Sequence, residues 1–108
     1  QTRSFFYVSD LVQGLYKFIN LEKKITTPIN SGNDYEISLL KVAKLIKKLC
    51  SSKSKIIYKK IPENYPNVRS PKLKLLKKVL KWELTTSLEN SLKNTINYLK
   101  KLFNNKRL

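Results

Sequence analysis

The chain has 108 residues with 23 lysines and arginines against seven acids, no histidine, no methionine and one cysteine. This length fits one domain or part of one, and the absence of histidine excludes the usual zinc sites and a Ser-His-Asp arrangement. No apolar run approaches the roughly 18 residues of a membrane span, and Cys50 has no second cysteine with which to form an internal disulfide.

The chain opens on a pattern that is typical of the middle of a structured unit. Arg3 begins an aromatic and β-branched run that predicts a short strand over 3–8. Ser9 is the expected N-cap of a helix that ends near Asn20, with Asp10 in its first turn, where a carboxylate suits the helix dipole. We therefore expect the chain to be the C-terminal remainder of a longer protein.

The middle of the chain predicts two strands around a clear helix. Residues 28–31 are expected to form a short strand that ends at a Gly-Asn-Asp turn. Ser38 is the expected cap of the helix, and residues 55–58 are expected to form the second strand. The apolar stripe of the helix consists of Leu39, Val42, Ala43, Ile46, Leu49 and Cys50.

The last third begins with a loop that contains Pro62, Pro66 and Pro71 and cannot be regular throughout. A short helix is expected over 73–80, and Ser87 should cap a long final helix. The predicted class is therefore α/β, with three or four helices and two or three short strands. Because such strands cannot form a self-sufficient sheet, some of them should pair with a sheet outside this sequence.

The positive charge is carried almost entirely by lysines spread along the whole chain. Only Arg3, Arg69 and Arg107 are arginine, whereas proteins that read base sequence favour arginine for bidentate contacts. We interpret the net charge of +16 chiefly as a solvated surface. A polyanion site remains the alternative.

Two of the arginines stand out. Arg3 precedes the first strand, and Arg69 lies in the proline-rich loop, where stiffness lowers the entropy lost on closing over a ligand. A guanidinium grips phosphate oxygens through a planar fork that lysine lacks. Spacing alone leaves open whether these are ligand contacts or ordinary surface arginines.

The order of several motifs resembles the region that follows the nucleotide-binding domain in extended short-chain dehydrogenase/reductases. The resemblance covers nearly the whole chain and is greatest to UDP-glucuronate decarboxylases. It is carried by Gln1-Thr2-Arg3-Ser4-Phe5, Tyr7-Val8-Ser9-Asp10-Leu11-Val12, Pro28-Ile29-Asn30-Ser31-Gly32-Asn33, the segment from Ser52 to Pro71, Trp82-Glu83 and Ser87-Leu88-Glu89.

The resemblance implies the C-terminal sugar-nucleotide-binding portion, residues 1–103 with a frayed tail at 104–108, of an enzyme whose Rossmann domain lies outside this sequence. In such enzymes two arginines at the positions of Arg3 and Arg69 clasp the pyrophosphate of a UDP-sugar. Tyr7 would wall the nucleotide pocket or serve as a plain core tyrosine, and we interpret Asp10 as helix-start chemistry.

The implied reaction uses tightly held NAD to oxidise the sugar at C4, loses carbon dioxide and reduces the 4-keto sugar to give UDP-xylose. The glycine-rich NAD loop and the Tyr-x-x-x-Lys pair do not occur in this chain, so it should be inactive by itself. The whole enzyme would be a homodimer. It would lie in the cytoplasm or, for an animal protein, in the Golgi lumen.

Several positions depart from the family pattern. Lys72 replaces an acid that faces the ribose, and Lys81 replaces a glycine suited to a left-handed helix end. Leu76 stands at a small alanine position, Leu84 at a proline, and Asn64-Tyr65 where two acids usually precede the next proline. These changes indicate either drift in a biased genome or a decaying copy.

Three alternatives remain open at this point. The first keeps the scaffold but makes the parent a nucleotide-sugar epimerase or 4,6-dehydratase. The second is a small basic helical module that binds nucleic acid or another polyanion. The third is a non-catalytic remnant that pairs with a partner chain.

Overall fold

The computed structural model describes residues 1–23, 25–65, 68–69 and 72–106, with only the backbone described for Val68, Arg69 and Lys106. This part of the chain forms four helices and three short strands, which confirms the expected α/β class. The elements in chain order are β1 (Thr2–Arg3), α1 (Val8–Ile19), β2 (Ile37–Ser38), α2 (Leu39–Leu49), β3 (Val68–Arg69), α3 (Lys74–Leu80) and α4 (Leu88–Lys106).

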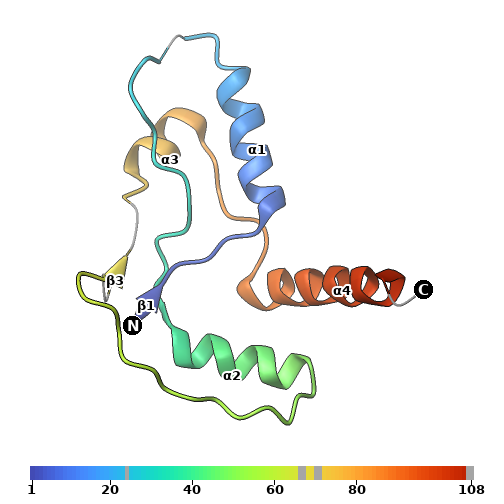
Figure 1. Ribbon diagram of the computed structural model, residues 1–108. Coiled ribbons are helices and arrows are strands. Elements are labelled where there is room, and N and C mark those ends of the chain that lie inside the picture. Colours follow the sequence, from blue (N-terminus) through green and yellow to red (C-terminus); the bar gives the residue numbers. More distant parts are fainter. Residues whose placement is uncertain (24, 66–67, 70–71, 107–108) are drawn as a thin grey trace.

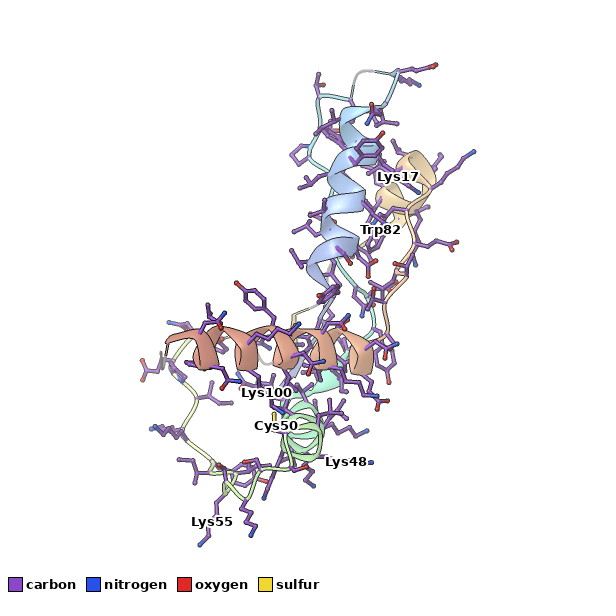
Figure 2. All side chains as sticks on the ribbon, turned by 90° about the vertical axis from the view of Figure 1, so that its right-hand side faces the viewer. Lys17, Lys48, Cys50, Lys55, Trp82 and Lys100 are labelled. Atoms are coloured by element: carbon purple, nitrogen blue, oxygen red, sulfur yellow. The ribbon has the colours of Figure 1, made fainter. Side chains whose placement is uncertain are left out.

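The strands form one small sheet in the order β2-β1-β3. The central strand β1 pairs antiparallel with β2 and parallel with β3. In Figure 1, α1 and α3 lie to one side of this sheet and α2 and α4 to the other. The sheet therefore joins two helical arms, which Figure 2 shows from a second direction.

The first helix begins earlier than the sequence predicts. Its N-cap is Tyr7, whose carbonyl accepts from the backbone N–H groups of Asp10 (3.0 Å) and Leu11 (3.3 Å). Ser9 consequently lies inside the helix, and its prediction as the N-cap is wrong. The expected strand over 3–8 is likewise too long, because β1 ends at Arg3 and the chain then turns into the helix.

Two other expected strands do not form among the described residues. Residues 28–31 and 55–58 carry no strand assignment, and Ile57 and Tyr58 are exposed. A strand exists only where a neighbour supplies hydrogen bonds, and no described segment pairs with either stretch. The strand that does form in this half, β3, lies inside the loop that the prolines led us to predict as irregular.

The caps predicted at Ser38 and Ser87 are confirmed. The backbone N–H of Lys41 donates to the Ser38 hydroxyl (3.1 Å) at the start of α2. The backbone N–H of Asn90 donates in the same way to Ser87 (3.2 Å) before α4. The expected short helix is also confirmed as α3, whereas the boundary predicted after residue 103 stays a prediction.

The core lies between α1 and α3. It is formed by the buried side chains Leu73, Leu76, Leu80 and Trp82, with Phe6, Leu21, Ile29 and Val79 packed against them. The indole of Trp82 meets the Phe6 ring edge-on, at 6.2 Å between centroids and 89° between planes. Gly14 lets α1 approach this indole, because a Cβ at that position would lie 3.3 Å from Trp82 Nε1.

Much apolar surface stays open outside this core. One stripe of α1 is exposed, and the radius of gyration is 17.1 Å where about 13 Å is typical of a single domain of this length. The described helices include none that is long and apolar enough to cross a membrane. The exposed α1 stripe consists of Val8, Val12, Leu15, Tyr16 and Ile19.

We predict that Lys81→Gly stabilises the chain. Lys81 follows α3 in the left-handed conformation (φ 50°, ψ 32°), which costs a residue with a Cβ about 1 kcal/mol more than glycine. The free energy of unfolding should rise by about 1 kcal/mol in urea titrations followed by the fluorescence of Trp82, the single tryptophan. Lys78→Gly, inside α3, is the matched control and should lower it by a similar amount. A loss of stability in the Lys81 variant would contradict this account.

Candidate functional site

The first arginine of the predicted pair is held at the end of the central strand. Arg3 Nη1 donates to the carbonyl of Thr2 (2.6 Å), and the side chain is half-buried. The guanidinium carbon lies 5.1 Å from the centroid of the Tyr65 ring, within the range of a cation–π contact. The Arg3 side chain is therefore held by its own strand and by the Tyr65 ring.

The second arginine lies on the neighbouring strand. β1 and β3 run parallel with Arg3 paired to Arg69, so the fold joins two positions that are far apart in the sequence. Neighbouring strands lie about 4.8 Å apart, which places the two backbones side by side. The side chain of Arg69 lies outside the described part of the structure, as do Pro66 and Pro71, and its role stays a prediction.

The loop that leads into β3 begins with a tight turn. The backbone N–H of Tyr65 donates to the carbonyl of Pro62 (3.2 Å), and Asn64 takes a positive φ of 62°. Asparagine tolerates this left-handed conformation better than most residues. The turn sets the position of Tyr65, which the sequence analysis noted only as a departure from the family pattern. Lys72, another such departure, is exposed just before α3.

Tyr7, the third predicted site residue, lies on a different groove. It precedes α1 and lines a mainly apolar hollow of about 500 Å³ between the chain after β1 and the helix α4. Arg3 is not part of this lining. Whether Tyr7 walls a nucleotide pocket therefore stays a prediction.

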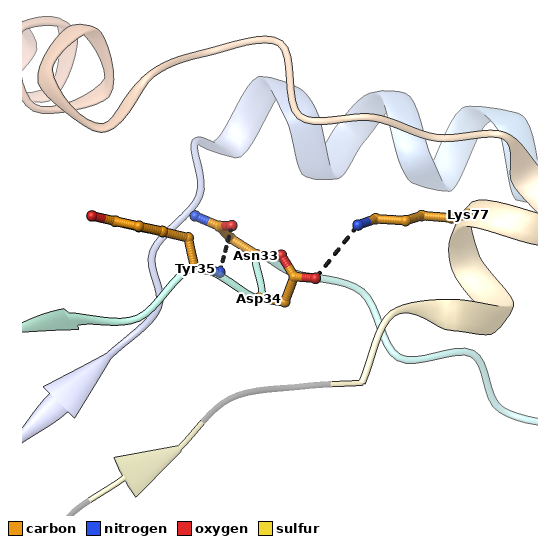
Figure 3. A network of polar contacts seen from close by, with 4 residues as sticks. All are labelled: Asn33, Asp34, Tyr35 and Lys77. Carbon is orange, nitrogen blue, oxygen red and sulfur yellow. Dashed lines mark hydrogen bonds and ion pairs between the residues drawn. The ribbon is translucent and has the colours of Figure 1, made fainter.

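A polar network fixes the turn after the predicted 28–31 segment (Figure 3). The Asn33 amide donates to the carbonyl of Phe5 (2.9 Å) and its oxygen accepts from the backbone N–H of Tyr35 (3.0 Å). The carboxylate of Asp34 meets Lys77 Nζ at 3.4 Å in an exposed ion pair, a kind that contributes little stability. The network thus ties residues 33–35 to the chain just after β1 and to α3.

Asp10 does more than place a carboxylate in the first turn of α1, because it also bonds to the chain after α3. Its side chain is fully buried. The carboxylate accepts from the hydroxyl and backbone N–H of Thr85 and from the backbone N–H of Thr86 (3.2 Å). Its backbone carbonyl accepts from Trp82 Nε1 (2.8 Å). The residue therefore clamps the chain after α3 onto the first turn of α1.

The two glycines do not form a place for a dinucleotide. Gly14 lies within α1 against Trp82, and Gly32 is buried in the bend before the Asn33 network. Neither belongs to a strand-to-helix turn whose backbone N–H groups could cradle a phosphate. Neither glycine therefore provides the phosphate-binding turn of a dinucleotide site.

Comparison with known proteins relates nearly the whole chain to one group of enzymes. No family model matches it. It is 40% identical over 101 residues to UDP-glucuronic acid decarboxylase 1 of Xenopus tropicalis, covering 94% of this chain and 24% of that protein. It is 42% identical over 98 residues to UDP-glucuronic acid decarboxylase 1 of Danio rerio, covering 91% and 23%. UDP-glucuronic acid decarboxylase 4 of Arabidopsis thaliana is 36% identical over 92 residues, or 85% and 20%.

Solved structures of two UDP-sugar epimerases match the fold of nearly the whole chain. The UDP-glucose 4-epimerase of Thermotoga maritima, determined with UDP-glucose, matches with a TM-score of 0.84 and 25% identity, covering 94% of this chain and 32% of that one. The UDP-glucuronic acid 4-epimerase of Bacillus cereus, determined with UDP-glucuronic acid and NAD, matches with a TM-score of 0.86 and 24% identity, covering 94% and 33%. The fold is that of a C-terminal portion of an extended short-chain dehydrogenase/reductase, as predicted.

The chain is thus a homologue of UDP-glucuronic acid decarboxylases that spans about a quarter of the length of the curated relatives it matches. The match lies in the C-terminal part of those proteins.

We predict that Asp10→Asn destabilises the chain although it keeps the shape of the side chain. An amide nitrogen would face a donor at Thr85 or Thr86, which would leave a buried N–H without an acceptor. The free energy of unfolding should fall by about 2 kcal/mol, measured by urea titration.

Glu89→Gln provides the control for that substitution. Glu89 forms an exposed pair with Lys93 in α4 (3.4 Å), so its neutralisation should change stability by about 0.5 kcal/mol or less. If both variants unfold at the same denaturant concentration, the buried carboxylate is not the clamp described above.

Proposed function

We propose that this chain is the UDP-sugar-binding C-terminal portion of an NAD-dependent UDP-glucuronate decarboxylase, a carboxy-lyase that converts UDP-glucuronate to UDP-xylose and carbon dioxide. The identity of 36–42% to proteins of that name supports the choice of enzyme. The observation that carries the proposal is the parallel pairing of Arg3 with Arg69. An epimerase parent is the coarser alternative, since the solved relatives are epimerases.

The pairing suits a diphosphate for an electrostatic reason. In this proposal the two guanidinium groups converge on one anion, which would replace their mutual repulsion with two charge-assisted interactions. Arginine is suited to this because its planar fork donates to two phosphate oxygens at once. We assign Arg3 and Arg69 to the pyrophosphate of the UDP-sugar and Tyr7 to the wall of its nucleotide pocket.

We assign NAD and the catalytic groups to the portion of the enzyme that this chain does not match. The relatives are about four times longer, and no Tyr-x-x-x-Lys pair occurs in the 108 residues. The exposed α1 stripe offers an apolar surface on which a Rossmann domain would dock. Dimerisation belongs in this proposal to the parent enzyme.

The chain alone should have no decarboxylase activity. Incubated with NAD and UDP-glucuronate, it should form no UDP-xylose above the level of a protein-free blank, as measured by chromatography of the nucleotide sugars. A full-length decarboxylase such as that of Danio rerio, treated identically, is the positive control. Formation of UDP-xylose by the purified chain would show that the catalytic groups lie within it.

UDP binding should depend on the planar guanidinium groups of Arg3 and Arg69 and not only on their positive charge. Arg69→Lys and Arg3→Lys each keep the charge but remove the fork, so each should weaken UDP binding about tenfold in calorimetric titrations, equal to about 1.4 kcal/mol. Lys100→Ala on α4 should leave the affinity unchanged.

The same titrations separate the proposal from polyanion binding, which the net charge of +16 favours. A basic module would bind a generic DNA duplex tightly at low salt and lose most of that affinity as salt rises. It would respond more to Lys100→Ala, which removes a positive charge, than to Arg69→Lys, which keeps it. That pattern, with no measurable UDP binding, would replace the sugar-nucleotide assignment.

A further inference from the structure

Tyr65 forms an aromatic contact with Arg3, one of the two arginines predicted to bind the diphosphate. The Tyr65 ring centroid lies 5.1 Å from the guanidinium carbon. The ring itself is half exposed, at 51%. Tyr65 is therefore open to solvent while its ring contacts Arg3.

A tight backbone turn positions Tyr65 in the chain. The turn from Pro62 closes through the Tyr65 N–H, and the left-handed Asn64 completes it. Proline fixes its own φ, so this turn loses little further freedom when the ring is positioned. The backbone position of Tyr65 is thus set by a local turn.

An aromatic ring holds a guanidinium differently from an acid. The cation is attracted to the ring face, and this contact uses none of its N–H groups. A carboxylate at the same place would accept hydrogen bonds from those groups and would add a negative charge beside an incoming phosphate. An acid beside Arg3 would therefore compete with the phosphate, whereas the Tyr65 ring is a neutral support.

We propose that Tyr65 is a positioning residue for diphosphate binding: its ring supports the Arg3 guanidinium without occupying its donors. This inference rests on the proposed UDP-sugar function. It adds a residue that the sequence analysis did not assign to the site. It also predicts that an acid at position 65 is worse than no contact at all.

The test is a set of four substitutions at one position. Tyr65→Phe keeps the ring and should bind UDP within twofold of the unaltered chain. Tyr65→Leu removes the ring and should bind about fivefold more weakly. Tyr65→Glu should bind at least tenfold more weakly, whereas its uncharged match Tyr65→Gln should resemble the leucine variant. Inorganic pyrophosphate should follow the same order as UDP, because the effect acts on the diphosphate.

A spectroscopic measurement separates positioning from general stability. The ring current of Tyr65 should displace the Arg3 Nε–H proton signal, identified by its loss in Arg3→Lys. The displacement should persist in Tyr65→Phe and vanish in Tyr65→Leu. Thermal melting of each variant checks that the chain stays folded, which the exposure of Tyr65 favours.

The outcomes distinguish the inference from the proposed function. If the unaltered chain binds neither UDP nor pyrophosphate, both are overturned. If binding depends on Arg3 and Arg69 but Tyr65→Leu binds like the unaltered chain, the function stands and the role of Tyr65 is overturned. If Tyr65→Glu binds as well as Tyr65→Gln, the argument from competing charge is wrong.

Discussion

The Asp10 clamp, formed by buried hydrogen bonds, holds the helix that follows β1, the strand that carries Arg3. The indole of Trp82 donates to the Asp10 carbonyl, and the Asp10 carboxylate accepts from Thr85 and Thr86. Three parts of the chain meet there: the start of α1, the end of α3 and the segment that enters α4. Because the carboxylate is fully buried, each of its hydrogen bonds replaces one that water would otherwise make. The Asp10 clamp therefore fixes the start of α1, which follows the strand that carries Arg3, against the chain after α3.

The small sheet is a weak element by itself. Two-residue strands make few backbone hydrogen bonds, and sheets of this size are marginal without covering layers. Its pairing also brings two arginines together, Arg3 on β1 and Arg69 on β3. A ligand with two negative charges would strengthen the pairing of β1 with β3 by binding across it, which links ligand affinity to the stability of the sheet. The site and the sheet would then form together.

The sequence predicted what is locally encoded and missed what needs distant partners. Ser38 and Ser87 cap their helices through hydrogen bonds three residues away, so the pattern alone was sufficient. The strands expected at 28–31 and 55–58 have suitable residues but no described partner, since hydrophobic alternation does not reveal which segments pair. β3 was missed because prolines on both sides predict a loop. The Arg3–Tyr65 contact and the Asp10 clamp were missed because each joins residues that are far apart in the sequence.

Two departures from the family pattern, Lys81 and Leu76, change the stability of the fold in opposite directions. Lys81 holds a left-handed conformation that glycine would adopt at lower cost. Leu76, where a small residue was expected, is 1% exposed and forms the centre of the core. Burying its side chain contributes about 2 kcal/mol more than an alanine would, which exceeds the cost of about 1 kcal/mol at Lys81. Tyr65 contacts Arg3 without adding a negative charge beside it. The gain at Leu76 therefore offsets the cost at Lys81, so these two departures together leave a chain that can fold.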